Sequence, residues 1–289
     1  MPRLPALVLA ALMAAAIPVS SSPLLAESAP AVTAPSPRIT ALSDTMQMTD
    51  VFAVMIEEGQ DYGASIEDQM FPGQGGVRWS AMVTSIYDPA ALRVIFDGAM
   101  EDGLGKDAGA IAAAEAFFGT PRGQTILRLE VQARRALLDK AVEEAAQVEA
   151  ERMQTDHDPR MRLIRDLAEA SDLIEMNVAG ALSANLAFLQ GMASVEVPGV
   201  VIDQESMMTE VWSQEADIRN ETVLWLFPYL ALAYGPLSDD DLKAYLDFAQ
   251  SPEGKRLNGA VFAAFDKVFA HVSFELGRSG ALIMQGSDI

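Results

Sequence analysis

The chain has 289 residues, of which 50% are hydrophobic and 21% are charged, a composition typical of a packed protein rather than a disordered one. Its 41 acidic and 20 basic residues give a formal net charge of −21, which would repel phosphate backbones and anionic lipid and so argues against nucleic-acid or membrane-surface binding. The sequence has no cysteine and two histidines, which excludes disulfides and effectively excludes zinc sites with His and Cys ligands.

The N-terminal segment is typical of a signal peptide. Arg3 precedes an apolar run at residues 4–17 that is too short to span a bilayer comfortably, and Pro18 and Pro23 follow among small residues. We expect residues 1–31 to be a signal peptide cleaved between positions 22 and 31, with an uncleaved N-terminal anchor as the alternative. This predicts a periplasmic or secreted bacterial protein with no later transmembrane segment. Residues 32–43, rich in Pro, Ser and Thr, predict a linker.

Residues 44–155 predict a first helical repeat. Apolar residues recur at helical spacing between positions 48 and 56, and the glycine cluster at 72–76 predicts a flexible loop, because the strand and the Lys-Ser/Thr fingerprint of a phosphate site are missing. Asp88-Pro89 is a cap-and-start signal for a helix. Pro121 is expected to begin one long helix that continues through Met153.

Residues 156–289 predict a second helical repeat. One long helix is expected over 160–193, and the strand-like segment 195–202 is interpreted as a loop because Pro198-Gly199 interrupts it. Pro228 should kink or end a helix, and residues 279–289 are expected to be a frayed tail. The predicted fold is all-α, with two tandem related helical bundles.

A helix corner occurs twice in the chain. The segments FFGTPRGQ (117–124) and FAQSPEGK (248–255) share Phe, Ser or Thr, Pro and Gly at a constant offset of 131 positions. Such a match would arise by chance roughly once in a hundred chains of this length, so we predict a tandem duplication. Thr and Ser should cap the second helix, with Pro at its first position. The corner residues are Phe117, Thr120, Pro121, Gly123, Phe248, Ser251, Pro252 and Gly254.

Both corners resemble the bacterial family named domain of unknown function 2059, which has a short helix with an acidic opening, an aromatic pair, a Ser-Pro-x-Gly corner and a second helix. Residues 238–255 match the acidic opening and the corner, with Ala249 in place of the second aromatic. Residues 111–124 keep the aromatic pair Phe117-Phe118 but have only Asp107 as an acidic opening. The resemblance implies a secreted helical module and supplies no catalytic residues.

Two features near the corners allow a ligand-binding or a packing interpretation. Gly123 and Gly254 could expose N–H groups at a helix start to a ligand, or could allow close approach of the preceding helix. The packing interpretation is favoured, because the Ser or Thr of the corner already supplies a hydroxyl oxygen to those N–H groups. Arg134 and Arg135 could bind an anion, but pairing with Glu130 or Asp139 one turn away is the favoured interpretation.

The sequence contains no catalytic motif of the G-x-S-x-G, P-loop, dinucleotide-binding or His-Glu-x-x-His type. The run Asp156-His157-Asp158 resembles a metal cluster, but adjacent side chains point in different directions and Asp158-Pro159 predicts an N-cap. His271 is expected to be a surface or packing residue. We therefore expect no enzyme, no metal and no cofactor; an enzyme of unknown class stays an alternative, because folding can bring carboxylates together.

The most favoured function is a non-enzymatic periplasmic binding or scaffolding module for another envelope protein. The alternative is a carrier of a small apolar ligand in a helical groove. That groove would be lined by Met207, Met208, Trp212, Trp225 and Phe227. The sequence does not indicate the ligand, the partner or the oligomeric state.

Overall fold

The computed structural model describes residues 34–195 and 203–286, and in these ranges the chain folds into helices without a strand. The predicted all-α class is therefore confirmed. The predicted signal peptide lies outside the described residues, as does nearly all of the segment 195–202. None of the helices in the described ranges is long and apolar enough to cross a membrane.

The helices follow one another with short connections. In the first half of the chain they are α1 (Pro37–Thr45), α2 (Met48–Met70), α3 (Gly76–Ile86), α4 (Pro89–Leu104), α5 (Ala108–Phe118), α6 (Pro121–Ala136) and α7 (Lys140–Thr155). In the second half they are α8 (Pro159–Ala170), α9 (Leu173–Ala193), α10 (Gln204–Ser213), α11 (Glu215–Tyr234), α12 (Asp239–Gln250) and α13 (Pro252–Gln285).

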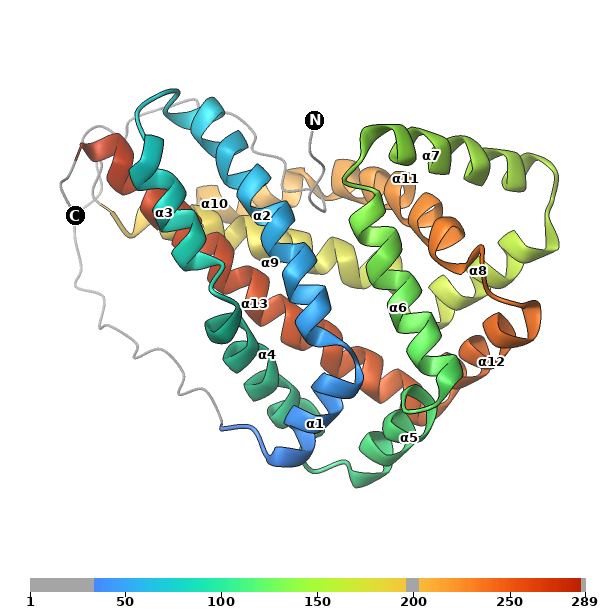
Figure 1. The fold of residues 1–289 in the computed structure, drawn as a ribbon. Coiled ribbons are helices and arrows are strands. Elements are labelled where there is room, and N and C mark those ends of the chain that lie inside the picture. Colours follow the sequence, from blue (N-terminus) through green and yellow to red (C-terminus); the bar gives the residue numbers. More distant parts are fainter. Residues whose placement is uncertain (1–33, 196–202, 287–289) are drawn as a thin grey trace.

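Helix α13 runs through the middle of the molecule (Figure 1). Its 34 residues span about 51 Å at the usual helical rise, and it packs along α9 and α4. Where α9 and α13 cross, a Cβ atom on Gly191 would lie 2.0 Å from the carbonyl oxygen of Phe274, and one on Gly277 would lie 2.1 Å from that of Phe188. The close approach of these two helices therefore requires both glycines.

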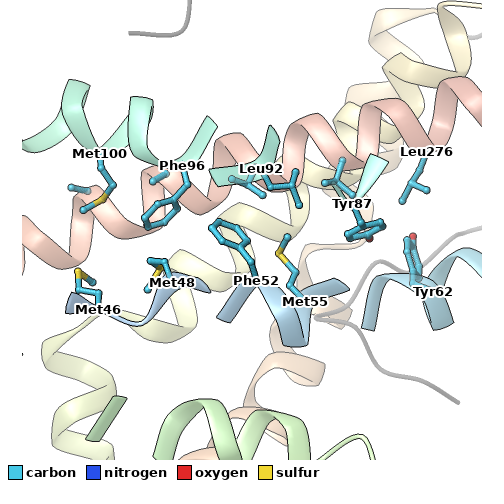
Figure 2. Close-up of a cluster of buried hydrophobic side chains, with 14 of the residues drawn as sticks. Met46, Met48, Phe52, Met55, Tyr62, Tyr87, Leu92, Phe96, Met100 and Leu276 are labelled. Carbon is cyan, nitrogen blue, oxygen red and sulfur yellow. The ribbon is translucent and has the colours of Figure 1, made fainter. Parts of the chain in front are cut away.

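One hydrophobic core is formed by the five helices from α1 through α5, together with α13 and the end of α9. Figure 2 shows the apolar face of α2, including Met48, Phe52 and Met55, turned toward Leu92 and Phe96 of α4. The rings of Phe52 and Phe96 meet edge to face with centroids 5.7 Å apart. Burial of each such side chain contributes about 1.5–3 kcal/mol, so this face holds the N-terminal helices on α13.

A second hydrophobic core joins α6, α7, α8, α11 and α12, with Ile126, Ile164 and Leu242 fully buried in it. Each core therefore mixes the two halves of the sequence: the first takes α13 from the second half, and the second takes α6 and α7 from the first half. Two separate tandem bundles that divide at 155/156 are not confirmed, because the predicted repeats 44–155 and 156–289 bury their apolar faces against each other.

The two corners have the same local geometry. The Thr120 hydroxyl accepts a hydrogen bond from the Gly123 N–H at 3.1 Å, and the Ser251 hydroxyl accepts one from the Gly254 N–H at 3.0 Å. A Cβ atom added to Gly123 would lie 2.4 Å from the Phe117 carbonyl oxygen. One added to Gly254 would lie 2.0 Å from the Phe248 carbonyl oxygen. The packing interpretation of these glycines thus matches the structure, with backbone carbonyls rather than rings making the close approach.

The corners also pack against each other. The rings of Phe117 and Phe248 stack with centroids 4.4 Å apart and an interplanar angle of 10°. Arg122 of α6 pairs with Asp241 of α12 at 2.5 Å, and Arg256 of α13 pairs with Asp107 at the start of α5 at 2.6 Å. Each corner thus gives an arginine to the first helix of the other. The duplication stays a prediction, and this reciprocal pairing supports it.

Two helices predicted to be long are interrupted. The expected helix 121–153 breaks at residues 137–139, because the Asp139 carboxylate accepts a hydrogen bond from the Ala141 N–H at 2.8 Å and so caps α7. The expected helix 160–193 breaks at Ser171 and Asp172, where Asp172 is left-handed with a φ of 51°. There the freed Ser171 carbonyl accepts a hydrogen bond from the Asn258 side chain of α13 at 2.7 Å.

The predicted linker and tail are partly wrong. Ser36 caps α1, so residues 37–43 are helical, and Ile39 and Leu42 are fully buried in the first core. At the other end, α13 continues to Gln285 with Ala281 and Ile283 buried. Apolar side chains are buried when α1 packs against α4 and when the end of α13 packs into the molecule. This burial outweighs the local sequence signals that predicted a linker and a frayed tail. The structure also continues α11 through Pro228 instead of ending the helix there.

Candidate functional site

A large cavity lies between the two hydrophobic cores. Its volume is about 920 Å³, within the usual range for small-molecule sites. Helices α2, α6, α7, α9, α11, α12 and α13 contribute to its wall, which is mainly apolar and includes Val51, Val131, Ala184 and Phe265. The cavity therefore offers an apolar molecule a place to bury its surface.

Glu130 of α6 is the polar centre of this wall. The Tyr234 hydroxyl donates a hydrogen bond to its Oε1 at 2.8 Å, and the Tyr229 hydroxyl donates one to its backbone carbonyl at 3.4 Å. Burial raises the pKa of Glu130 from 4.5 to about 7, although hydrogen bonds from the Tyr234 and Tyr245 hydroxyls oppose the rise. Near neutral pH the carboxyl group is thus able either to accept or to donate a hydrogen bond.

The tyrosines around Glu130 act as hydrogen-bond donors at neutral pH. Burial raises the pKa of Tyr234 and of Tyr245 well above its ordinary value of 10.0, and the nearby Glu130 raises both further. Their rings meet edge to face with centroids 6.0 Å apart. This places two tyrosine hydroxyl groups, on rings that pack against each other, beside the carboxyl group.

Arg134, one turn along α6 from Glu130, is held by Glu58 of α2. Two hydrogen bonds join them, from Nε to Oε1 at 2.7 Å and from Nη2 to Oε2 at 2.6 Å. Arg135 makes a looser pair with Glu57 at 3.6 Å. The predicted pairing with Glu130 or Asp139 is therefore wrong, because the packing of α2 against α6 brings two carboxylates of another helix to the arginines.

The pH dependence of stability is expected to reveal the partly buried Glu130. An acid whose pKa is higher in the folded state than in the unfolded state binds more protons when folded, so its contribution to stability is present at low pH and is lost as the pH rises from about 4.5 to about 7. Between pH 5 and pH 8 the free energy of unfolding should fall by about 2–3 kcal/mol more in the wild type than in Glu130→Gln. Denaturant unfolding of both proteins at the two pH values measures this difference; equal falls would contradict it.

The residues of the predicted groove do not share one surface. Met208 and Trp212 lie on α10 with exposed fractions of 38% and 61%, whereas Met207 is buried. Phe227 packs under the Arg165 guanidinium, whose carbon lies 5.6 Å from the ring centroid. Trp225 alone of the five borders the cavity, and its indole N–H has no hydrogen-bond partner among the described residues.

The other candidate motifs serve structural roles. In the glycine-rich turn, the Gly75 and Gly76 N–H groups donate to the Glu67 carboxylate at 3.1 and 2.8 Å, so a side chain of α2 occupies the place of an anion. Asp158 caps α8 through the Arg160 N–H at 2.8 Å. No group of three or more His, Cys, Asp or Glu side chains in the described part of the chain could hold a metal ion.

The sequence offered little that could locate this site. The site draws its polar residues from three different helices, with Glu58 on α2, Glu130 on α6 and Tyr234 on α11. None of them belongs to a sequence motif that would mark it as a site residue. A local signal exists only in the density of aromatic residues between positions 225 and 245. No protein-family profile, curated protein sequence or solved structure matches the chain. The resemblance to domain of unknown function 2059 stays a prediction.

Proposed function

We propose that this protein is an exported, non-enzymatic carrier that binds a small amphipathic molecule in the cavity between its two cores. The observation that carries the proposal is the cavity itself, with a volume of about 920 Å³ and a mainly apolar wall in which Glu130 accepts a hydrogen bond from Tyr234. Each square ångström of apolar ligand surface buried there contributes about 25 cal/mol to binding. The site differs from the groove expected from sequence, and Trp225 is common to both.

The polar groups at the centre favour binding over turnover. Around Glu130 they are the hydrogen-bonded tyrosines and, one turn along α6, a closed ion pair between Arg134 and Glu58. Catalysis by carboxylates usually employs a second group positioned as nucleophile or base opposite the first. Export rests on the N-terminal segment at residues 1–31, and it would place the carrier in the periplasm or outside the cell.

A cavity-filling substitution tests the proposal. Gly180 borders the cavity on α9, and a Cβ added to it meets no atom within 4 Å, so Gly180→Phe should fill space without disturbing the helix. Binding of an apolar fluorescent probe should weaken about tenfold. Gly259→Phe is the matched control, because Gly259 of α13 also has no neighbour within 4 Å but does not border the cavity. Equal probe binding by both variants and the wild type would refute the proposed site.

A second candidate is an interaction module for another envelope protein. The exposed fractions of Trp212 on α10 and Leu224 on α11 are 61% and 64%, and a partner that covered these side chains would bury their apolar surface. A purified one-to-one complex that is lost in Trp212→Ser and retained in Gly180→Phe would favour this function over the carrier.

A further inference from the structure

We propose that the cavity selects an organic cation, namely an amine carried on an apolar body, and that Glu130 receives its charged end. This inference rests on the carrier function proposed above and adds the chemical class of the ligand. It is carried by the partners of Glu130, by the charges of the cavity wall and by the aromatic side chains that border the same cavity.

Glu130 is a carboxyl group within the protein that lacks a counter-ion. Its side chain accepts hydrogen bonds from the Tyr234 and Tyr245 hydroxyls and makes no ion pair among the described residues. Arg134, the arginine of the same helix that borders the cavity, is held by two hydrogen bonds to Glu58. An ionised carboxylate away from water is costly unless a positive charge lies beside it. A bound ammonium group would supply that charge.

The charged residues of the cavity wall also favour a cation. Two basic side chains border the cavity, Arg134 and Lys140, against five acidic ones. The acidic ones are Glu58, Asp61, Glu130, Glu143 and Asp266. The whole chain carries a net charge of −21, so the surrounding field has the same sign. A ligand with a carboxylate end, such as a fatty acid, would meet repulsion here.

Aromatic rings complete the arrangement. Tyr229, Tyr234, Tyr245 and Trp225 all border the cavity, and the Trp225 and Tyr229 rings lie with centroids 6.1 Å apart. The face of an aromatic ring attracts a cation through its quadrupole, and this attraction is strongest where water is excluded. Carboxylate and aromatic faces together discriminate an ammonium group from a hydroxyl group of the same size.

Three probes with the same apolar body test the inference: decylamine, decanol and decanoate, titrated calorimetrically into the wild-type protein at pH 7.5. Decylamine should bind about tenfold more tightly than decanol, and decanoate should bind more weakly than either. In Glu130→Gln the affinity for decylamine should fall about tenfold while that for decanol stays unchanged. Asp266→Asn, which removes another carboxylate of the wall, should change decylamine binding less than about threefold.

The outcomes separate the two proposals. If no probe binds, or if Gly180→Phe leaves binding unchanged, the carrier function fails. If decanol or decanoate binds as tightly as decylamine while Gly180→Phe still weakens binding, the carrier stands and the cation selectivity is wrong. Comparison of the three probes on the wild-type protein gives this answer even if Glu130→Gln does not fold.

Discussion

Replacement of Gly277 by alanine is expected to lower the free energy of unfolding by about 3 kcal/mol, a fall in Tm of roughly 6–12 °C for a chain of this size. The added Cβ would lie 2.1 Å from the Phe188 carbonyl oxygen and 3.0 Å from its carbonyl carbon. These are backbone atoms of α9, so no side chain can rotate to relieve the clash. The two helices must separate along the longest contact of the fold, which joins α9 to the central α13.

Helix propensity alone predicts that a Gly→Ala substitution raises the free energy of unfolding, and this makes Gly259→Ala an informative control. Alanine is better than glycine in a helix interior by about 1 kcal/mol. Gly259→Ala on the same helix meets no atom within 4 Å and should leave stability unchanged or raise it by up to about 1 kcal/mol. Thermal and denaturant unfolding measure both variants. A Gly277→Ala protein as stable as Gly259→Ala would contradict the close crossing.

Replacement of Arg134 by methionine is expected to cost about 2–4 kcal/mol at pH 7, because it leaves the Glu58 carboxylate without its partner. The exposed fractions of the two side chains are 27% and 12%, so water screens the pair only in part. Methionine keeps the apolar stem and removes the charge. Adding Glu58→Gln should restore much of the loss, since the unpaired charge is then gone.

Arg135 provides the matched control one position along the same helix. Its distance to Glu57 is 3.6 Å, and both side chains are about half exposed, at 47% and 50%. Arg135→Met should therefore change the free energy of unfolding by about 0–1 kcal/mol. Urea unfolding of the two single variants and the double variant decides the matter. Similar losses for both arginines would show that the pair between α2 and α6 does not stabilise the fold.

The position of the cavity follows from the way the corners meet. Phe117 and Phe248 stack where the two corners join, and α6 and α13 leave this point in different directions (Figure 1). Residues of both helices border the cavity, together with residues of α2, α9 and α11. A corner geometry that is local in sequence thereby contributes to a large cavity at the junction of two cores.

The sequence by itself determined the local features of this protein. Helix starts at Pro89, Pro121, Pro159 and Pro252 lie where the cap signals predicted them, because a capping side chain and a proline at the first position act within a few residues. The all-α class follows from helical periodicity over most of the chain.

Only the tertiary structure decided which charges and faces meet. These contacts include the partner of Arg134, the exchange of α6 and α13 between the cores and the grouping of Glu130 with Tyr234. They join residues far apart in the sequence, 104 positions in the case of Glu130 and Tyr234. Amphipathic periodicity specifies which face of a helix is buried, but not against which other helix, since many apolar faces bury similar area. Steric fit, such as the glycine crossing of α9 and α13, selects among them and so places the cavity.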